Sequence, residues 1–251
     1  MGRLMAAPLR PLPDFLIVGA QRAGTTSLFN YLSASPDIYP SAVKEIHFFD
    51  NNYAKGRLWY RSFFPLGARS STKRTGEATP YLLFHPSAPD RVEAVIPDVH
   101  VIVLLRNPVD RAYSHYWFTR RRGLEPLRFE EAIEAEAERL EGSEAVAASG
   151  VSRAHRQLSY LQRGRYVEQL PRWEGFTTSV VFSERLYRDP QATTERVCDA
   201  LDARPPDAAV YRTFNEGSYP PMARSVRRRL ERHFHPFNLA LAQMLGEDPG
   251  W

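Results

Sequence analysis

Three short apolar runs divide the chain, and longer segments between them repeat apolar and polar residues at helical spacing. The runs are residues 15–19 (FLIVG), 99–105 (VHVIVLL) and 179–182 (SVVF), and they are rich in β-branched side chains. A strand buried on both faces is apolar along its whole length, whereas a half-exposed strand alternates. The runs therefore predict buried strands of a parallel sheet.

Helical patterns follow these runs. Residues 24–32 carry apolar side chains at helical spacing directly after the first run. After the second run, Asn107 can cap a helix and Pro108 fits its first turn, so we expect a helix that continues to about Arg120. Further amphipathic segments lie at 86–96, 127–140, 155–173, 190–203 and 223–245. Strands that alternate with helices predict an α/β fold with a central parallel sheet flanked by helices.

The length of 251 residues is enough for one sizeable core, and we expect a single domain over residues 1–251. Hydrophobic residues at 43% and charged residues at 25% are ordinary values for a globular chain. We expect residues 1–13 to be flexible. Residues 141–154 are small, polar and without periodicity, so they predict a mobile loop.

The single cysteine, Cys198, excludes an intrachain disulfide and a cysteine-cluster metal site, and fits a reducing compartment. The sequence has no run of about 18 apolar residues, which a membrane-spanning helix needs. Its first 13 residues are too short and too proline-rich for a signal-peptide core. These features predict a cytoplasmic protein that does not insert into a membrane.

The net charge of +4 depends almost wholly on arginine, since only three of the 33 basic residues are lysines. Arginine suits bidentate capture of phosphate and sulfate, although a biased base composition of the gene would give the same excess. Arginine clusters at 120–122 and 224–229 permit a nucleic-acid partner. Glu231 is interleaved with the second cluster, and we favour solvated helix faces and expect no nucleic-acid partner.

Residues 19–27 (GAQRAGTTS) lie between the first strand and its helix, where backbone N–H groups and the helix dipole form an anion site. Gly19 and Gly24 have the spacing of the triphosphatase loop G-x-x-x-x-G-K-[ST], but Thr25 stands where the lysine belongs. The second apolar run delivers Arg106, where triphosphatases place a carboxylate for magnesium. An enzyme of the P-loop nucleotide-kinase type that uses ATP is therefore the second choice.

A glycine-rich turn can also serve only to pack a helix closely against a strand. Four further side chains in this loop argue for an anion site instead. They are Arg22 and the hydroxyl-bearing Thr25, Thr26 and Ser27.

At these residues the chain resembles sulfotransferases that use 3′-phosphoadenosine 5′-phosphosulfate (PAPS). FLIVGAQRAGTTSLFNYL resembles their 5′-phosphosulfate loop, and VIVLLRNPVDRAYSHYWF resembles their 3′-phosphate motif. The segments KEIHFFD (44–50), GEATPY (76–81) and GRYVEQLPRW (164–173) are similar to the branch that contains heparan sulfate N- and 3-O-sulfotransferases and many bacterial relatives. The resemblance implies a P-loop, nucleotide-kinase-like fold, PAPS as co-substrate and transfer without a metal.

The resemblance also implies roles for individual residues. The 5′-phosphosulfate would be bound by Arg22, Ala23, Gly24, Thr25, Thr26 and Ser27. Arg22 holds the position of a family lysine and would stabilise the leaving phosphate, since an arginine does not readily give up a proton at neutral pH. Arg106 and Ser114 match the arginine and serine that hold the 3′-phosphate.

Glu45 matches the glutamate that acts as general base in the heparan branch. His47 is either an orienting partner or a second candidate for the base, and the sequence leaves this open. We expect a hydroxyl or amine acceptor on a carbohydrate-like or small molecule. Ala78 replaces a lysine that contacts substrate in some members, and residues 215–221 replace their basic loop over the nucleotide. The acceptor, the lid around 215–224 and the oligomeric state therefore stay unassigned.

Overall fold

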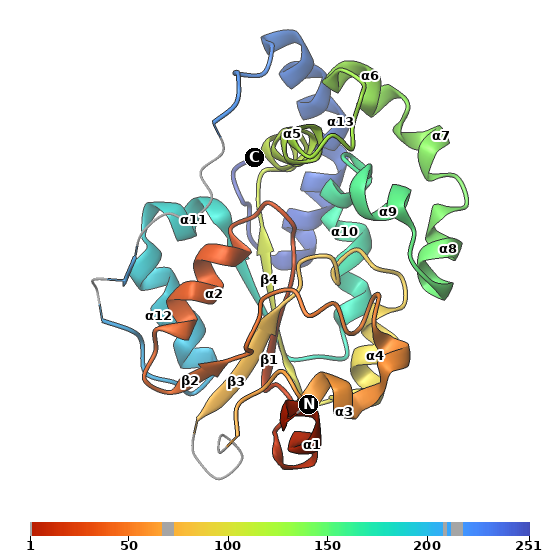
Figure 1. The fold of residues 1–251 in the computed structure, drawn as a ribbon. Coiled ribbons are helices and arrows are strands. Elements are labelled where there is room, and N and C mark those ends of the chain that lie inside the picture. The colour runs from red at the N-terminus through yellow and green to blue at the C-terminus, as the bar shows by residue number, and fades with distance from the viewer. Residues whose placement is uncertain (1, 67–72, 208–209, 212–217) are drawn as a thin grey trace.

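A parallel sheet of five strands forms the centre of the computed structural model, which describes residues 2–66, 73–207, 210–211 and 218–251. The strand order is β2-β3-β1-β4-β5. The strands are β1 (Phe15–Gly19), β2 (Ile38–Pro40), β3 (Arg74–Ala78), β4 (His100–Leu105) and β5 (Thr178–Phe182). All neighbouring strands are parallel, so their carboxyl ends meet at one edge of the sheet (Figure 1).

Helices cover both sides of this sheet. In Figure 1, α2, α11 and α12 lie on one side of it, and α4 and α10 on the other. The helices that precede the middle of the chain are α1 (Gly2–Met5), α2 (Thr25–Ser33), α3 (Gly56–Arg61), α4 (Ala88–Val95) and α5 (Pro108–Arg121). Those that follow are α6 (Phe129–Glu134), α7 (Glu136–Leu140), α8 (Ser143–Ser149), α9 (Arg153–Gln157), α10 (Tyr166–Gln169), α11 (Ser183–Arg188), α12 (Pro190–Ala200) and α13 (Arg224–Leu245). Short 3-10 helices are η1 (Ala7–Leu9), η2 (Tyr53–Lys55), η4 (Gln162–Gly164) and η5 (Leu170–Trp173).

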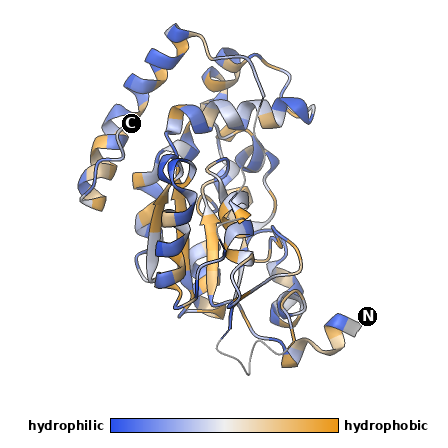
Figure 2. Ribbon diagram, turned by 90° about the vertical axis from the view of Figure 1, so that its left-hand side faces the viewer, coloured by the Kyte–Doolittle hydropathy of each residue, from blue (hydrophilic) through white to orange (hydrophobic). Residues whose placement is uncertain are grey.

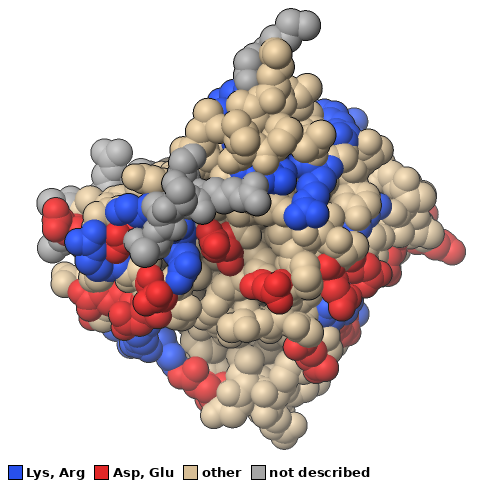
Figure 3. Space-filling model, turned by 90° about the horizontal axis from the view of Figure 1, so that it is seen from below, with Lys and Arg blue, Asp and Glu red and all other residues tan. Residues whose placement is uncertain are grey.

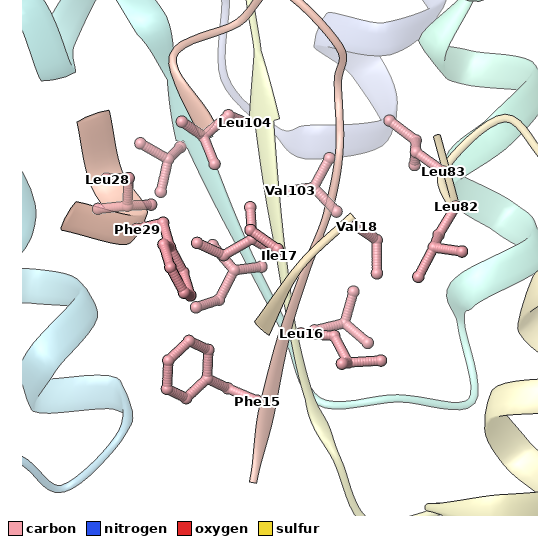
Figure 4. Packing of buried hydrophobic residues seen from close by; sticks show 14 of the residues in the cluster. Phe15, Leu16, Ile17, Val18, Leu28, Phe29, Leu82, Leu83, Val103 and Leu104 are labelled. Carbon is pink, nitrogen blue, oxygen red and sulfur yellow. The ribbon is translucent and has the colours of Figure 1, made fainter. Parts of the chain in front are cut away.

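The central strand β1 is buried along its whole length. Its side chains alternate between the two helical layers: Phe15 and Ile17 point toward α2, where Phe29 packs, and Leu16 and Val18 point to the other side (Figure 4). Figure 2 shows the same arrangement as apolar strands between helices of mixed polarity. The core thus fixes β1 and β4, which carry the candidate phosphate-binding segments at their carboxyl ends.

The α/β fold and the three predicted strands are confirmed, but β2 and β3 were not predicted. β2 has only three residues, and β3 has the sequence RTGEA, which lacks an apolar run. Glu77 is nevertheless fully buried in β3, because Tyr60 and Thr79 each donate a hydrogen bond of 2.8 Å to its carboxylate. Tyr60 lies 17 residues away along the chain, so the burial of Glu77 in this strand could not be read from the neighbouring sequence.

The predicted mobile loop at 141–154 is wrong for most of its length. Residues 143–149 form α8, since alanine favours a helix even where apolar periodicity is missing. Ala147 is buried, and Arg91 donates a hydrogen bond of 2.9 Å to the carbonyl of Ala148. Ser152 then caps α9 through the N–H of His155.

The predicted amphipathic segments at 127–140 and 155–173 are each divided in the structure. The second one breaks after α9, where Arg163 donates to the carbonyl groups of His155 and Arg156. Carbonyl groups in the last turn of a helix lack backbone N–H partners, and Arg163 satisfies two of them here. Within the part of the chain that the structure describes, no helix combines the length and the apolar character needed to cross a membrane.

The segment that we expected to be flexible, residues 1–13, makes defined contacts in its described part. Ala7 is buried, Arg10 donates to the carbonyl of Phe64, and Arg61 donates a hydrogen bond of 2.6 Å to the carbonyl of Arg10. These contacts do not measure motion, so the flexibility of this segment stays a prediction, as does the single domain.

The register between β1 and β3 can be tested at Gly76, which pairs with Phe15. A Cβ atom at Gly76 would lie 2.4 Å from the Phe15 ring, so G76A should lower the free energy of unfolding by about 1–3 kcal/mol, as overpacked cores do. Urea unfolding measures the change. The matched control is G175A, where an added Cβ atom meets nothing within 4 Å. Equal stability of the two variants would contradict this packing.

Candidate active site

A cavity of about 1130 Å³ opens beyond the carboxyl ends of β1, β3 and β4. Its walls come from the loop after β1, the segment around residue 45, α5, α9 and α11. The predicted site residues that line it are Arg22, Gly24, Thr25, Thr26, Ser27, Glu45, Arg106 and Ser114. Ala23 and His47 lie behind this surface: Ala23 is fully buried, and the side chain of His47 is 16% exposed. The structure therefore brings segments far apart in sequence into one site.

The loop between β1 and α2 presents the start of a helix to the cavity. Gly24 is the N-cap residue of α2 and has a left-handed conformation (φ 92°), so no side chain caps the first N–H groups of the helix. An added Cβ atom there would lie 2.9 Å from the Tyr187 hydroxyl, so both backbone and space require glycine. The N–H groups of the first turn of α2 have no helical partners and suit an anion.

Arg22 joins the two candidate phosphate sites. Its Nε donates a hydrogen bond of 3.0 Å to Ser114 Oγ, and its carbonyl accepts one of 2.9 Å from Arg106. Its guanidinium also lies 5.1 Å from the centre of the Phe118 ring. Burial, and then the charge of Arg106, lower the pKa of Arg22. Two guanidinium groups held this close repel one another, so an anion between them would be stabilised.

An aromatic wall closes the cavity beside α5. The ring of Tyr219 lies parallel to Trp117, with centroids 6.3 Å apart, and the Tyr113 hydroxyl donates a hydrogen bond of 2.9 Å to the carbonyl of Pro220. Tyr187 lines the cavity from α11. Of the segment left unassigned in the sequence, residues 215–217 lie outside the described residues, and Tyr219 is the part that reaches the cavity. Its contacts with α5 are distant in sequence and had no local signal.

Glu45 is fixed by β3. Its N–H donates a hydrogen bond of 2.9 Å to the carbonyl of Ala78, the last residue of that strand. Glu45 and His47 both have left-handed backbone conformations (φ 60° and 54°), and Asn52 braces the turn through its side chain, which donates to the carbonyl of Ile46 (3.1 Å). This turn directs the carboxylate into the cavity.

The Glu45 carboxylate lies among cationic groups. Lys44 Nζ is 2.8 Å from Oε1, and His47 Nε2 is 3.5 Å from Oε2. Burial raises the pKa of Glu45, but the hydrogen bond from His47 and the charge of Lys44 outweigh it and lower the pKa to about 2. A carboxylate held this firmly is ionised and is a weak base.

His47 is held by two further side chains. Its Nδ1 is 2.7 Å from Asp50 Oδ2, and Asp50 is almost fully buried. Burial lowers the pKa of His47, but hydrogen bonds to Asp50 and Glu45 outweigh it and raise the pKa to about 9. On the other side, Arg156 Nη2 lies 2.8 Å from His47 Nε2. Sequence reasoning assigned no role to Asp50 or Arg156, and Arg156 has no motif around it that could have identified it.

Several arginines of the clusters at 120–122 and 224–229 make contacts within the chain. Arg227 pairs with Asp110 (2.5 Å) and Arg229 with Glu134 (2.8 Å). The face at the amino ends of the strands mixes basic and acidic side chains (Figure 3). The absence of a nucleic-acid partner stays a prediction. No group of three or more His, Cys, Asp or Glu side chains among the described residues is arranged to hold a metal ion.

The contact between Asp50 and His47 can be tested by titration. D50N removes the carboxylate that favours the protonated imidazole, so the pKa of His47 should fall below its value of about 9. Proton NMR of the imidazole measures it, with His100, which hydrogen-bonds Ser179 on the sheet, as internal control. An unchanged midpoint for His47 would contradict the pairing.

Comparison with known proteins identifies the family. The sulfotransferase domain model matches residues 12–227. Human heparan sulfate glucosamine 3-O-sulfotransferase 6 is 32% identical over 96% of this chain and 74% of its own length. The Caenorhabditis elegans bifunctional heparan sulfate N-deacetylase/N-sulfotransferase 1 is 28% identical over 96% of this chain but only 31% of its own length.

The crystal structure of a sulfotransferase from Alicyclobacillus acidocaldarius has a TM-score of 0.76 and 28% identity, and covers 95% of this chain and 97% of that one. The sulfotransferase domain from the curacin biosynthetic pathway shares the fold, with a TM-score of 0.51 and 12% identity over 90% of this chain and 98% of that one. Sulfotransferases are transferases that use PAPS as co-substrate, and none of these matches favours a kinase. The chain therefore belongs to the sulfotransferase family.

Proposed function

We propose that this chain transfers the sulfuryl group of PAPS to a hydroxyl or amine of a carbohydrate acceptor, with Glu45 as general base and Arg22 stabilising the leaving phosphate. One observation carries the proposal: the loop after β1, the Arg106–Ser114 pair and Glu45 all line the same cavity. A donor with two separate anionic groups and an acceptor that must lose a proton need this combination.

The donor set of the cavity fits PAPS. The 5′-phosphosulfate would lie at the first turn of α2, where Thr25, Thr26 and Ser27 offer N–H groups and hydroxyls. The 3′-phosphate would be held by Arg106 and Ser114, which reach the loop through Arg22. We assign Ala23, which is buried, a structural part in the loop and not a direct contact.

Transfer requires the acceptor atom, the sulfur and the leaving oxygen in line. The acceptor oxygen or nitrogen forms a bond to sulfur, the bond from sulfur to the phosphate oxygen breaks, and the acceptor proton passes to a Glu45 carboxylate oxygen. Arg22 offsets the negative charge that grows on the leaving phosphate. Its role is electrostatic, because a guanidinium is a very weak acid.

The acceptor class rests on the relatives, whose names specify heparan sulfate glucosamine or heparan sulfate. The polar wall near Glu45, which includes Lys44, Arg156 and Gln157, suits a hydroxyl-rich molecule. An assay with defined acceptors distinguishes O-sulfation from N-sulfation. We also propose a cytoplasmic location, which the lone, buried Cys198 supports.

Selectivity for the 3′-phosphate tests the donor assignment. R106A removes a charged donor, and charge-assisted hydrogen bonds of this kind contribute about 1.5–3 kcal/mol, or roughly a 10- to 150-fold change in affinity. We expect R106A to lose that much affinity for 3′-phosphoadenosine 5′-phosphate (PAP), but little for ADP, by calorimetric titration. R228A, an exposed arginine on α13, is the control and should bind PAP as the native chain does. Equal losses for PAP and ADP would place the 3′-phosphate elsewhere.

The base assignment is tested by E45Q, which keeps the shape of the side chain and removes its basicity. General base catalysis contributes about 10²- to 10⁴-fold, so kcat should fall by that factor. The affinity for PAP should not change, because Glu45 does not touch the donor in this account. Turnover of a glucosamine-containing oligosaccharide, followed by mass spectrometry, measures the rate. A variant with native kcat would rule out Glu45 as the base.

A further inference from the structure

The two ring nitrogens of His47 meet opposite kinds of partner. Nδ1 faces the Asp50 carboxylate at 2.7 Å, and Nε2 faces the Arg156 guanidinium at 2.8 Å. A guanidinium can only donate hydrogen bonds, so Nε2 must accept and carries no proton in this arrangement. Nδ1 then carries the proton and donates it to Asp50. The contact with Arg156 therefore needs the neutral imidazole with its proton on Nδ1. Burial and the charge of Arg156 lower the pKa of His47, but the hydrogen bonds to Asp50 and Glu45 outweigh them and raise it to about 9, so the protonated and the neutral ring compete.

Glu45 competes with Arg156 for the same nitrogen. Its Oε2 lies 3.5 Å from Nε2, at the long limit of a hydrogen bond and farther than the Arg156 donor. A proton on Nε2 would repel the Arg156 donor and would be donated to Glu45. Two arrangements therefore exclude one another: a protonated His47 paired with Glu45, and a neutral His47 bound to Arg156. Glu77 of β3 also interacts electrostatically with His47, and its buried carboxyl group already accepts from Tyr60 and Thr79.

The two arrangements differ in the strength of Glu45 as a base. When Glu45 is paired with a cationic imidazole, its carboxylate is stabilised and takes up a proton less readily. When His47 is neutral and bound to Arg156, Glu45 loses its pairing with a cationic ring and keeps the one with Lys44. The second arrangement is therefore the better one for accepting the proton of a hydroxyl or amine.

Several contacts hold Arg156 in place beside His47. Its N–H donates to the carbonyl of Ser152 (3.0 Å), at the cap of α9. Its own carbonyl accepts from Arg163, which is buried and also contacts Gln21 in the loop after β1. The guanidinium lies 5.8 Å from the centre of the Tyr81 ring. Both the backbone and the side chain of Arg156 are thus anchored beside the cavity.

We propose that Arg156 is a positioning residue for proton transfer: by donating to Nε2 of His47 it opposes protonation of this imidazole, weakens the pairing of Glu45 with a cationic ring, and so makes Glu45 a stronger base. This inference rests on the function proposed above for Glu45. It assigns His47 the part of an orienting residue, because its Nε2 is occupied by Arg156 and its Nδ1 by Asp50.

The pH dependence of kcat/KM distinguishes this role from a structural one. R156M removes the group that opposes protonation of Nε2, so the acid limb should move to higher pH by about one unit, the lower end of what a neighbouring charge produces. Below the limb this is a roughly tenfold loss, which should vanish at pH values above it. R156K, which keeps a charged donor, should lie nearer the native profile. R153M, an exposed arginine change on the same helix, should reproduce the native profile.

A loss that is equal at all pH values, or an unchanged limb, would overturn the proposal. The protonation of His47 also has a readout that does not need activity: nitrogen-15 NMR of histidine-labelled protein. The Nε2 resonance should titrate at higher pH in R156M than in the native chain, and identical midpoints would overturn the proposal. If R156M does not fold, R156Q, which donates a hydrogen bond without carrying a charge, should give an intermediate midpoint.

If no acceptor is sulfated by the native chain, the proposed function fails, while the NMR titration still decides whether Arg156 opposes protonation of His47.

Discussion

The carboxyl ends of three adjacent parallel strands, β3, β1 and β4, determine the geometry of the site. β1 ends in the loop that leads to Gly24 and α2, and β4 ends directly before Arg106. The third strand acts through a backbone hydrogen bond, from the N–H of Glu45 to the carbonyl of Ala78 at the end of β3. A change of register in any of these pairs would move one chemical group relative to the others.

Two arginines, Arg22 and Arg106, carry positive charge at the carboxyl ends of these strands. The side chain of Arg22 donates to the hydroxyl of Ser114, and its backbone carbonyl accepts from Arg106, so the two anion sites are directly linked. Among the described residues, four other than glycine have positive φ, and three of them are Arg22, Glu45 and His47. Such conformations cost about 1–3 kcal/mol each and persist where surrounding contacts hold them. The strain is located at the residues to which we assign chemistry.

The sequence allowed the fold class and the phosphate-binding segments to be predicted because both depend on local patterns. An apolar strand followed by a glycine-rich turn identified residues 15–27, and an apolar strand followed by a capping asparagine identified the start of α5. Motif resemblance added Glu45 and His47. In contrast, β3 was missed because the buried Glu77 depends on Tyr60, which is 17 residues away. Arg156 was missed because it meets His47 across 109 residues of chain.

The central claim is that one cavity holds both anions of the donor beside Glu45. A crystal structure of the protein with PAP tests this claim most directly. The account predicts the 5′-phosphate at the N–H groups of residues 25–27 and the 3′-phosphate within hydrogen-bond distance of Arg106 and Ser114. It also predicts that the Glu45 carboxylate faces the position that the sulfuryl group would occupy. A 3′-phosphate bound away from Arg106, or a nucleotide outside this cavity, would contradict the account.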